Sequence, residues 1–299
     1  MDLQEVFRRV SAERTLTVSP VLWKIKLLFN VGSERKLRHA IRLINVLADH
    51  VIKQRRLEMN KNINKNSKDL LSRFIVNIED DGYLRDIVIS FLLAGRDTVA
   101  SGLTGLFWLL SKNPRVEKCI REESDALLGT VETREPSFNQ IGNMQYLHPA
   151  VHESLRLLPP VQFDSKFSLG NNELPDGTFI SRQTRVTYHP YAMGRMEQKW
   201  GPDATEFRPE RWLKDSVNGP VFSSESPFKY PVFQGGPRVC LGKEVAMMEM
   251  KSVALTLIRR FDVRVVDPNL PLRFSPGLTA NVSGGLPVIV TDKGNGQCL

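Results

Sequence analysis

The segment from Phe233 to Gly242 places a cysteine in a setting that can bind a metal through sulfur. Its sequence, FQGGPRVCLG, fits the pattern F-x-x-G-x-R-x-C-x-G, which a chain of this length matches by chance roughly once in 10⁴. A cysteine thiolate is a ligand of heme iron, and the electron density that it donates favours cleavage of an O–O bond. We therefore predict that Cys240 ligates a heme iron, and weigh this against a structural cysteine beside a glycine-rich turn.

The residues around Cys240 suit the same chemistry. Gly235, Gly236 and Pro237 can form a tight turn that exposes backbone N–H groups toward sulfur. The N-terminus of a following helix adds positive potential, which favours the thiolate. Arg238 can bind a heme propionate through charge-assisted hydrogen bonds, and Gly242 lets the helix approach the porphyrin closely. With Phe233, which begins the pattern, they form the predicted cofactor site.

A second group of candidate residues lies within a long apolar stretch, Leu84 to about Ser111. A charged residue there is costly unless it has partners or a chemical role. Gly95 opens a notch where a small ligand can sit, and we predict that it contributes to the cofactor site. Thr98 can hydrogen-bond an iron-bound dioxygen and Asp97 can relay protons, although a mid-helix threonine also commonly bonds back to a carbonyl. We predict that Asp97 and Thr98 are catalytic.

Three charged residues are candidates for a buried framework. Glu153 and Arg156 are spaced i, i+3 on a predicted helix, and the segment FRPERW supplies Arg211. Most such pairs lie at the surface and contribute a few tenths of a kcal/mol. A buried three-member network would instead fix the coil that carries the cysteine loop. The histidines have no metal-ligand spacing and are interpreted as structural: His39, His50, His148, His152 and His189.

Composition bounds the remaining possibilities. The chain has 299 residues, 41% hydrophobic and 25% charged, which is ordinary for a globular protein. A net charge of +8 permits an anionic partner, but no nucleic-acid motif accompanies it. Three widely spaced cysteines argue against a disulfide framework and for a reducing compartment. The N-terminal sequence has no apolar signal region, and we expect no membrane span.

Periodicity predicts a mostly helical body with a minor β part. Residues 1–57 are predicted helical, with Leu37, Ile41, Ile44, Leu47 and Val51 on one apolar face, and residues 58–68 are predicted to form a mobile loop. The long helix over 84–111 is apolar nearly all round, so we expect it to be buried in the centre of the molecule. Further helices are predicted over 115–128, 147–158 and 241–261. Short strands are predicted over 161–169, 178–180, 185–188, 263–266 and 286–290, and ordered coil over 200–232.

The motif set resembles a known family. The cysteine loop, A-G-x-D-T, E-x-x-R and P-E-R-W occur in the order and spacing of the cytochrome P-450 superfamily, and the resemblance covers nearly the whole chain. The segments PPVQFDSKFSLGNNELPDGTFI and YHPYAMGRMEQKWG resemble the plant fatty-acid ω-hydroxylase clan, which includes enzymes that oxidise the jasmonoyl-isoleucine hormone. The resemblance implies the C-terminal portion of the cytochrome P-450 fold, mainly α with a minor β part. A long central helix lies over the heme in that fold, and the cysteine-ligand loop lies beneath it.

The resemblance also implies cofactors, partners and a pocket. It implies heme b as the cofactor, with dioxygen and a small lipophilic molecule as substrates. It also implies a monomer that receives electrons from NADPH through NADPH–cytochrome P-450 reductase. We expect no nucleic acid as a partner. Carried over by position, the pocket residues are Val161, Gln162, Phe163, Asp164 and Leu278. Family chains begin with a membrane anchor on the cytosolic face of the endoplasmic reticulum, followed by early helices. Because both precede residue 1, we interpret 1–299 as a partial domain and expect it to bind heme weakly or not at all.

Four functions remain open at this point. The first is monooxygenation of an aliphatic C–H bond, at the terminal carbon of a fatty acid or in a fatty-acid-derived hormone conjugate. A rearranging enzyme of the same fold would not need the proton relay of Asp97 and Thr98. A truncated, catalytically silent heme-binding or interaction fragment is the alternative from another class. A basic nucleic-acid-binding protein has only the net charge in its favour.

Overall fold

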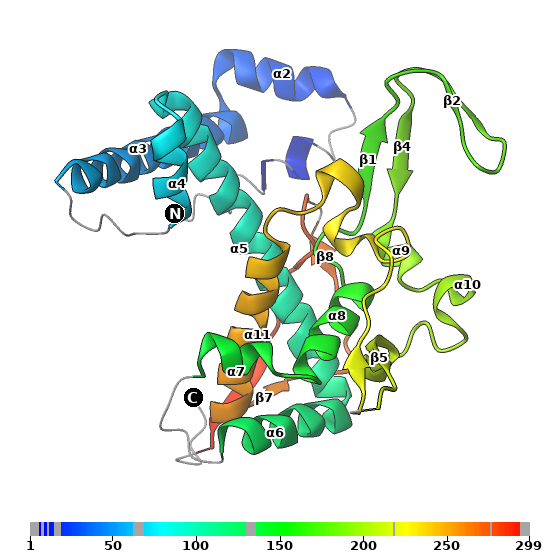
Figure 1. Cartoon of the computed structure of the whole chain (residues 1–299). Coiled ribbons are helices and arrows are strands. Elements are labelled where there is room, and N and C mark those ends of the chain that lie inside the picture. The colour runs from blue at the N-terminus through cyan, green and yellow to red at the C-terminus, as the bar shows by residue number, and fades with distance from the viewer. Residues whose placement is uncertain are drawn as a thin grey trace. The chain divides into compact units, whose positions relative to one another are not determined.

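The computed structural model describes residues 6, 9–10, 12–14, 19–61, 69–129, 136–217, 219–275 and 277–293. The chain divides into two compact units, residues 1–97 with 276–278, and residues 98–275 with 279–299. Both are mainly helical, and all described strands are short (Figure 1). The predicted fold class, mainly α with a minor β part, is confirmed.

The first unit contains helices α2 (Pro20–Phe29), α3 (Gly32–Asn60), α4 (Leu70–Asn77) and the beginning of α5 (Asp81–Lys112). Local signals set the helix ends, since α2 starts with a proline behind Ser19 and α4 starts behind Asp69, whose side chain accepts from the Ser72 N–H at 2.9 Å. Its small core joins Ile52 of α3, Ile75 of α4 and Leu84 of α5.

The apolar face predicted for α3 is wrong in part. Leu37 is buried as expected, but the other fully buried apolar residues are Ala40, Ala48 and Ile52. Ile41, Leu47 and Val51 are exposed, Leu47 by 53%. The buried stripe therefore lies part of a turn away from the largest side chains. Periodicity identified an amphipathic helix, but the position of α4 and α5 decides which side is covered.

The predicted loop over residues 58–68 begins too early. Helix α3 continues through Asn60, because Met59 packs against the Ile52 cluster and Glu58 bonds the Arg55 guanidinium at 2.7 Å. Residues 62–68 lie outside the described residues, so their predicted mobility stays a prediction.

The second unit holds the larger core. It contains the remainder of α5, with α6 (Pro114–Leu128), α7 (Phe138–Gly142), α8 (Leu147–Leu157), α9 (Pro190–Met193), α10 (Glu197–Trp200) and α11 (Lys243–Arg260). Leu106 and Leu110 of α5 pack with Ile120, Leu155 and Leu255 in one cluster. Three predicted helices are thereby confirmed to within about two residues. Helix α7, which a Ser137–Gln140 capping box starts, was not predicted.

Burial of α5 differs along its length. Leu106, Leu109 and Leu110 are buried, whereas Phe91 and Leu92 are exposed, Leu92 by 47%. The expectation that the whole helix is buried is therefore wrong for its earlier part. Among the described helices, α5 alone is long and apolar enough to cross a membrane by length and composition. Its later residues, Leu106, Leu109 and Leu110, belong to the core of the second unit.

The described β structure consists of two-stranded antiparallel pairs. The pair that bears on the site joins β1 (Asp164–Phe167) to β4 (Arg185–Tyr188), with Asp164 opposite Tyr188. The other pairs are β2 (Asn172–Glu173) with β3 (Phe179–Ile180), β5 (Leu213–Lys214) with β6 (Val221–Phe222), β7 (Phe261–Val265) with β10 (Val288–Asp292), and β8 (Phe274–Ser275) with β9 (Asn281–Val282). The predicted coil over 200–232 therefore contains a short hairpin, and also the 3₁₀ turn Pro209–Trp212.

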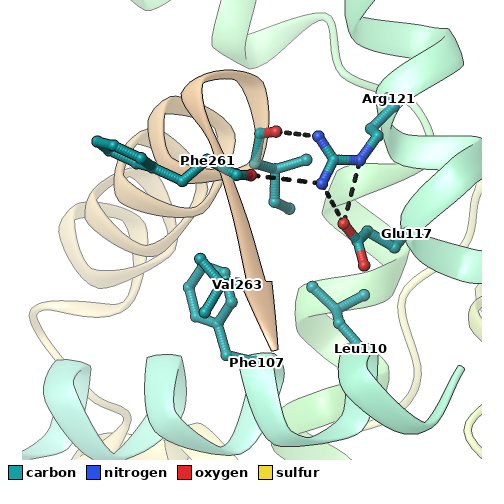
Figure 2. A pocket seen from close by; sticks show the side chains of 7 residues that line it. Phe107, Leu110, Glu117, Arg121, Phe261 and Val263 are labelled. Atoms are coloured by element: carbon teal, nitrogen blue, oxygen red, sulfur yellow. Dashed lines mark hydrogen bonds and ion pairs between the residues drawn. The ribbon is translucent and has the colours of Figure 1, made fainter. Parts of the chain in front are cut away.

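An arginine closes the C-terminal end of α11 (Figure 2). Arg121 of α6 donates to the carbonyl oxygens of Ile258 and Phe261, which lie where α11 gives way to β7. Glu117 orients this guanidinium by accepting from its Nε at 3.0 Å, and also bonds Arg264 at 2.6 Å. A cation at a helix C-terminus complements the helix dipole and the unpaired last carbonyls.

A pair of histidines lies in the aromatic core of the second unit. His148 and His152 are one turn apart on α8, with ring centroids 4.7 Å apart, and both contact Phe222. Burial and the nearby lysines, mainly Lys251 for His148, lower the pKa of His148 to about 4. The pKa of the more deeply buried His152 lies well below its usual value, chiefly because of burial. Both rings are therefore neutral near pH 7.

We expect the free energy of unfolding to fall as pH decreases from about 6.5 toward 4. In that window the unfolded chain protonates both histidines while the folded chain does not, so each contributes up to about 1.4 kcal/mol per pH unit. The measurement is urea unfolding between pH 7.5 and 4. His148→Phe and His152→Phe should each flatten the slope. Equal slopes in both variants and the unmodified chain would contradict the assignment.

Candidate cofactor site in the cysteine loop

Cys240 lies in a loop whose backbone bonds to itself. The Cys240 N–H donates to the Phe233 carbonyl at 2.8 Å, and the Val239 N–H donates to the Gly236 carbonyl at 3.1 Å. Gly236 has φ +67°, which favours glycine. Helix α11 begins at Lys243, three residues after the cysteine. The loop thus presents a free, exposed thiol near a helix N-terminus.

Gln234 occupies an unusual backbone conformation inside this loop. Its φ of 65° and ψ of −179° lie in a region that is favourable almost only for glycine. Holding a larger residue there costs on the order of 1–3 kcal/mol, so the surroundings must fix it. Its side chain is bonded on two sides, to Asp164 and Tyr188 of the β1–β4 hairpin.

The loop fits a heme. Large apolar side chains are exposed in the segment that contains the thiol, Leu241 by 81% and Phe228 by 76%, and a large apolar ring system would cover such residues. A Cβ built at Gly242 would meet no atom within 4 Å, so there is space beside the start of α11. Arg238 is exposed on the same loop and carries the charge that a propionate requires. The aromatic ring of Phe233 packs against the core.

The residues predicted for dioxygen chemistry all lie on α5. Asp97 and Thr98 are half-buried, and Gly95 is exposed with open space where its side chain would be. The helix continues through all three without interruption. Gly95 and Thr98 share a face of the helix because they are three residues apart, whereas Asp97 is adjacent to Thr98 and points in another direction.

A serine one turn after Thr98 joins segments that flank the predicted pocket residues. The buried Ser101 hydroxyl donates to the Ala280 carbonyl at 2.6 Å, and the Ala280 N–H donates to the Pro160 carbonyl at 2.7 Å. Pro160 directly precedes the predicted residues Val161, Gln162 and Phe163, and the turn that contains Ala280 also contains exposed Leu278. Sequence analysis gave Ser101 no role.

Two glycines of α5 allow neighbouring elements to approach closely. A Cβ at Gly102 would lie 2.8 Å from the sulfur of Met250 and 3.2 Å from Leu155, and one at Gly105 would lie 3.1 Å from the Cβ of Leu158. Side chains at these positions would push α8 and α11 away from α5. The order of apolar and small residues in α5 therefore sets the spacing of α5, α8 and α11.

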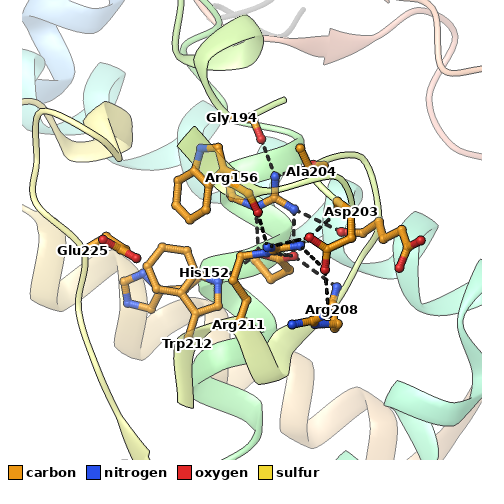
Figure 3. Close-up of polar contacts among 12 residues, drawn as sticks. His152, Arg156, Gly194, Asp203, Ala204, Arg208, Arg211, Trp212 and Glu225 are labelled. Carbon is orange, nitrogen blue, oxygen red and sulfur yellow. Dashed lines mark hydrogen bonds and ion pairs between the residues drawn. The ribbon is translucent and has the colours of Figure 1, made fainter. Parts of the chain in front are cut away.

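The predicted charged framework is present and buried (Figure 3). Glu153 has no exposed surface and accepts from Arg156 at 2.7 and 2.8 Å and from Arg211 at 3.3 Å. Trp212 donates its indole N–H to the same carboxylate at 2.9 Å, and the Arg208 backbone N–H donates at 3.1 Å. The carboxylate therefore joins α8 to the 3₁₀ turn that precedes the cysteine loop.

Backbone carbonyls accept the remaining hydrogen bonds of the two arginines. Arg156 donates to the carbonyls of Gly194, Ala204 and Glu206, and Arg211 donates to the Trp200 carbonyl at 2.6 Å. Arg211 also pairs with Asp203 at 3.0 Å. Gly194 is required, because a Cβ there would lie 2.2 Å from the Arg156 carbonyl oxygen.

We expect Glu153→Ala to lower the free energy of unfolding by about 3–5 kcal/mol, since it leaves the buried Arg156 guanidinium without its anion and removes one of the two carboxylates that pair with Arg211. Denaturant unfolding followed by circular dichroism measures this loss. Glu153→Gln, which keeps an acceptor, should lose less. Glu122→Ala breaks the exposed i, i+4 pair with Lys118 and should change stability by less than about 0.5 kcal/mol. Similar losses for Glu153→Ala and Glu122→Ala would contradict a buried framework.

Comparisons with known proteins agree with the fold and the motifs. The family model for Cytochrome P-450 matches residues 2–284. Cytochrome P-450 94C1 of Arabidopsis thaliana is 56% identical over 291 residues, which are 95% of this chain and 57% of that protein. Cytochrome P-450 94A1 of Vicia sativa is 43% identical over 291 residues, 95% of this chain and 55% of that protein. A Cytochrome P-450 of Helianthus annuus is 61% identical over 151 residues, 50% of this chain and 94% of that protein.

A helical domain with a thiol-presenting loop ahead of its last helix defines the class of heme-thiolate proteins. The chain belongs to the cytochrome P-450 family. It spans slightly more than half the length of its relatives from Arabidopsis thaliana and Vicia sativa.

Proposed function

We propose that this chain is the heme-binding part of a monooxygenase that hydroxylates an aliphatic C–H bond. The observation that carries the proposal is the exposed thiol of Cys240, which lies in a loop that turns at Gly236 and leads into α11. Cys240 is the proposed iron ligand, and Arg238 the proposed propionate partner. The proposed electron source is NADPH, through a flavoprotein reductase that docks transiently on a monomer.

Bound heme supplies the binding and reductive activation of dioxygen. In the proposal, Gly95 leaves room for that small ligand on α5. The Thr98 hydroxyl donates a hydrogen bond toward it, and the Asp97 carboxylate passes protons inward from solvent. A proton supply of this kind favours monooxygenation over a rearrangement, which consumes neither dioxygen nor protons.

The proposed substrate is a fatty acid oxidised at its terminal carbon, or a fatty-acid-derived hormone conjugate. Support comes from the two segments after α8 that resemble the ω-hydroxylase clan, and from the apolar character of Val161, Phe163 and Leu278. Phe163 and Leu278 are exposed, as expected of side chains that an apolar ligand would contact. The Gln162 carbonyl oxygen accepts a hydrogen bond from the Tyr191 N–H at 3.3 Å, which fixes the backbone at this position.

Thiolate ligation is tested by the carbon monoxide difference spectrum of the reduced chain with excess hemin. We expect a strongly red-shifted Soret band, because a thiolate donates charge to the iron. Cys240→Ser should abolish the band. Cys119→Ser, which removes a half-buried cysteine of α6, should retain it. A band that survives Cys240→Ser would overturn the proposal, whereas no band from the unmodified chain is the result expected of a partial domain that does not bind heme by itself.

The proton relay is tested by the amount of product formed per NADPH consumed in a reductase-coupled preparation. We expect Thr98→Ala to lower this yield severalfold and to release the missing electrons as peroxide, with heme content unchanged. The matched control is Thr104→Ala, two turns along α5, whose hydroxyl bonds the Ala100 carbonyl at 2.8 Å. Unchanged yield in Thr98→Ala would remove Thr98 from the mechanism.

A further inference from the structure

A polar cluster joins the β1–β4 hairpin to the cysteine loop. Asp164 and Tyr188 face each other across the two strands, and the Tyr188 hydroxyl lies 3.1 Å from the Asp164 carboxylate. Gln234 completes the cluster, because its amide N–H₂ donates to the Asp164 carboxylate at 2.9 Å and its amide oxygen accepts from the Tyr188 hydroxyl. Each of the three side chains thus contacts the other two.

The single Tyr188 hydroxyl proton has two acceptors within reach, the Gln234 amide oxygen and the Asp164 carboxylate, and the Gln234 N–H₂ donates to that carboxylate. Burial acts to raise the pKa of Asp164, but hydrogen bonds from the Ser165 N–H, Tyr188 and Gln234, with the charge of Lys166, leave it below its usual value. Burial and the neighbouring carboxylate raise the pKa of Tyr188, so its hydroxyl keeps its proton and can donate. An ionised acceptor on a rigid hairpin forms stronger hydrogen bonds than a neutral one.

Gln234 is well placed to transmit this anchoring to the thiol. It directly follows Phe233, whose carbonyl accepts from the Cys240 N–H at 2.8 Å, and it is the non-glycine residue of the loop with positive φ. Its backbone conformation is one that glycine would adopt more readily. The hydrogen bonds of its side chain to Asp164 and Tyr188 offset the cost of holding a glutamine in that conformation.

We propose that Asp164, Tyr188 and Gln234 are positioning residues that hold the cysteine loop in the geometry in which Cys240 binds iron as a thiolate. The inference rests on the proposed heme ligation. It gives Asp164 a role in addition to the predicted contact with substrate. The three residues act through Gln234 and the Phe233–Cys240 backbone bond, and none of them contacts the thiol itself in this arrangement.

The test is the fraction of carbon-monoxide-bound heme that shows the thiolate Soret band, as opposed to the less shifted band of thiol-ligated heme, at saturating hemin. Tyr188→Phe and Asp164→Asn should each lower the ratio of thiolate to thiol form by roughly two- to tenfold, the change that one hydrogen bond produces. Hydrogen exchange at the Cys240 amide, measured without heme, should accelerate in the same variants.

Further variants separate the effect of the Gln234 side-chain hydrogen bonds from the effect of its backbone conformation. Gln234→Gly eases the backbone conformation but removes the side-chain hydrogen bonds to Asp164 and Tyr188, so we expect the ratio of thiolate to thiol form to fall. Gln234→Glu places two carboxylates together and should lower it further, whereas Asp164→Asn combined with Gln234→Glu restores one donor and one acceptor and should recover most of the ratio. General loss of stability would not give this recovery.

Thr187→Val is the matched control. It removes a hydroxyl that pairs with Ser165 at 2.9 Å on the same two strands, at a position that alternates with Tyr188. Its ratio should equal that of the unmodified chain. An unchanged ratio in Tyr188→Phe and Gln234→Gly, or failure of the double variant to recover, would overturn the positioning role. Survival of the thiolate band in Cys240→Ser would instead overturn the heme ligation on which the inference rests.

Discussion

The carboxylate of Glu153 is wholly removed from water, so the protein itself must supply every hydrogen bond that it accepts. It accepts them from Arg156 on its own helix, and from Arg208, Arg211 and Trp212 on a segment more than fifty residues later. A buried charge that loses one such partner is strongly destabilised, so these distant segments can meet in only one register. That register fixes the 3₁₀ turn Pro209–Trp212, from which the chain continues to the cysteine loop.

From this turn to the thiol, anchoring changes from apolar packing to hydrogen bonds. Trp212 and Tyr230 lie edge to face with centroids 4.8 Å apart, and both are buried. Four residues after Tyr230 the chain reaches Gln234, which is half-buried and bonded to the hairpin. Cys240 itself is exposed. The loop can therefore be rigid where it leaves the core and still present a free sulfur, because its position does not depend on covering that sulfur.

Sequence patterns predicted one network of charged side chains, but they missed a residue whose neighbour is backbone and a residue at an unconstrained position of the motif. Glu153, Arg156 and Arg211 were predicted as one network and are found together. Gly194 and Gln234 were not predicted. Gly194 matters because the Arg156 carbonyl oxygen lies where its Cβ would be. Every residue has a backbone carbonyl, so no residue type in the sequence points to this contact. Gln234 occupies a variable position of the motif. The face of α3 was misjudged for a related reason, since periodicity within one helix does not reveal where its neighbours lie.

The coil between α9 and the 3₁₀ turn shows why an arginine is needed at position 156. Irregular backbone has no ladder of partners for its carbonyls, and burying it without donors is costly. The Arg156 guanidinium donates to the backbone carbonyls of Gly194, Ala204 and Glu206. It thus supplies the donors that a neighbouring strand supplies in a sheet. Its planar fork reaches several acceptors at once while also pairing with Glu153, which the single ammonium of a lysine does not reproduce. A charge pair within α8 thus orders a segment that is irregular apart from the short helix α10, and that segment leads to the loop that carries Cys240.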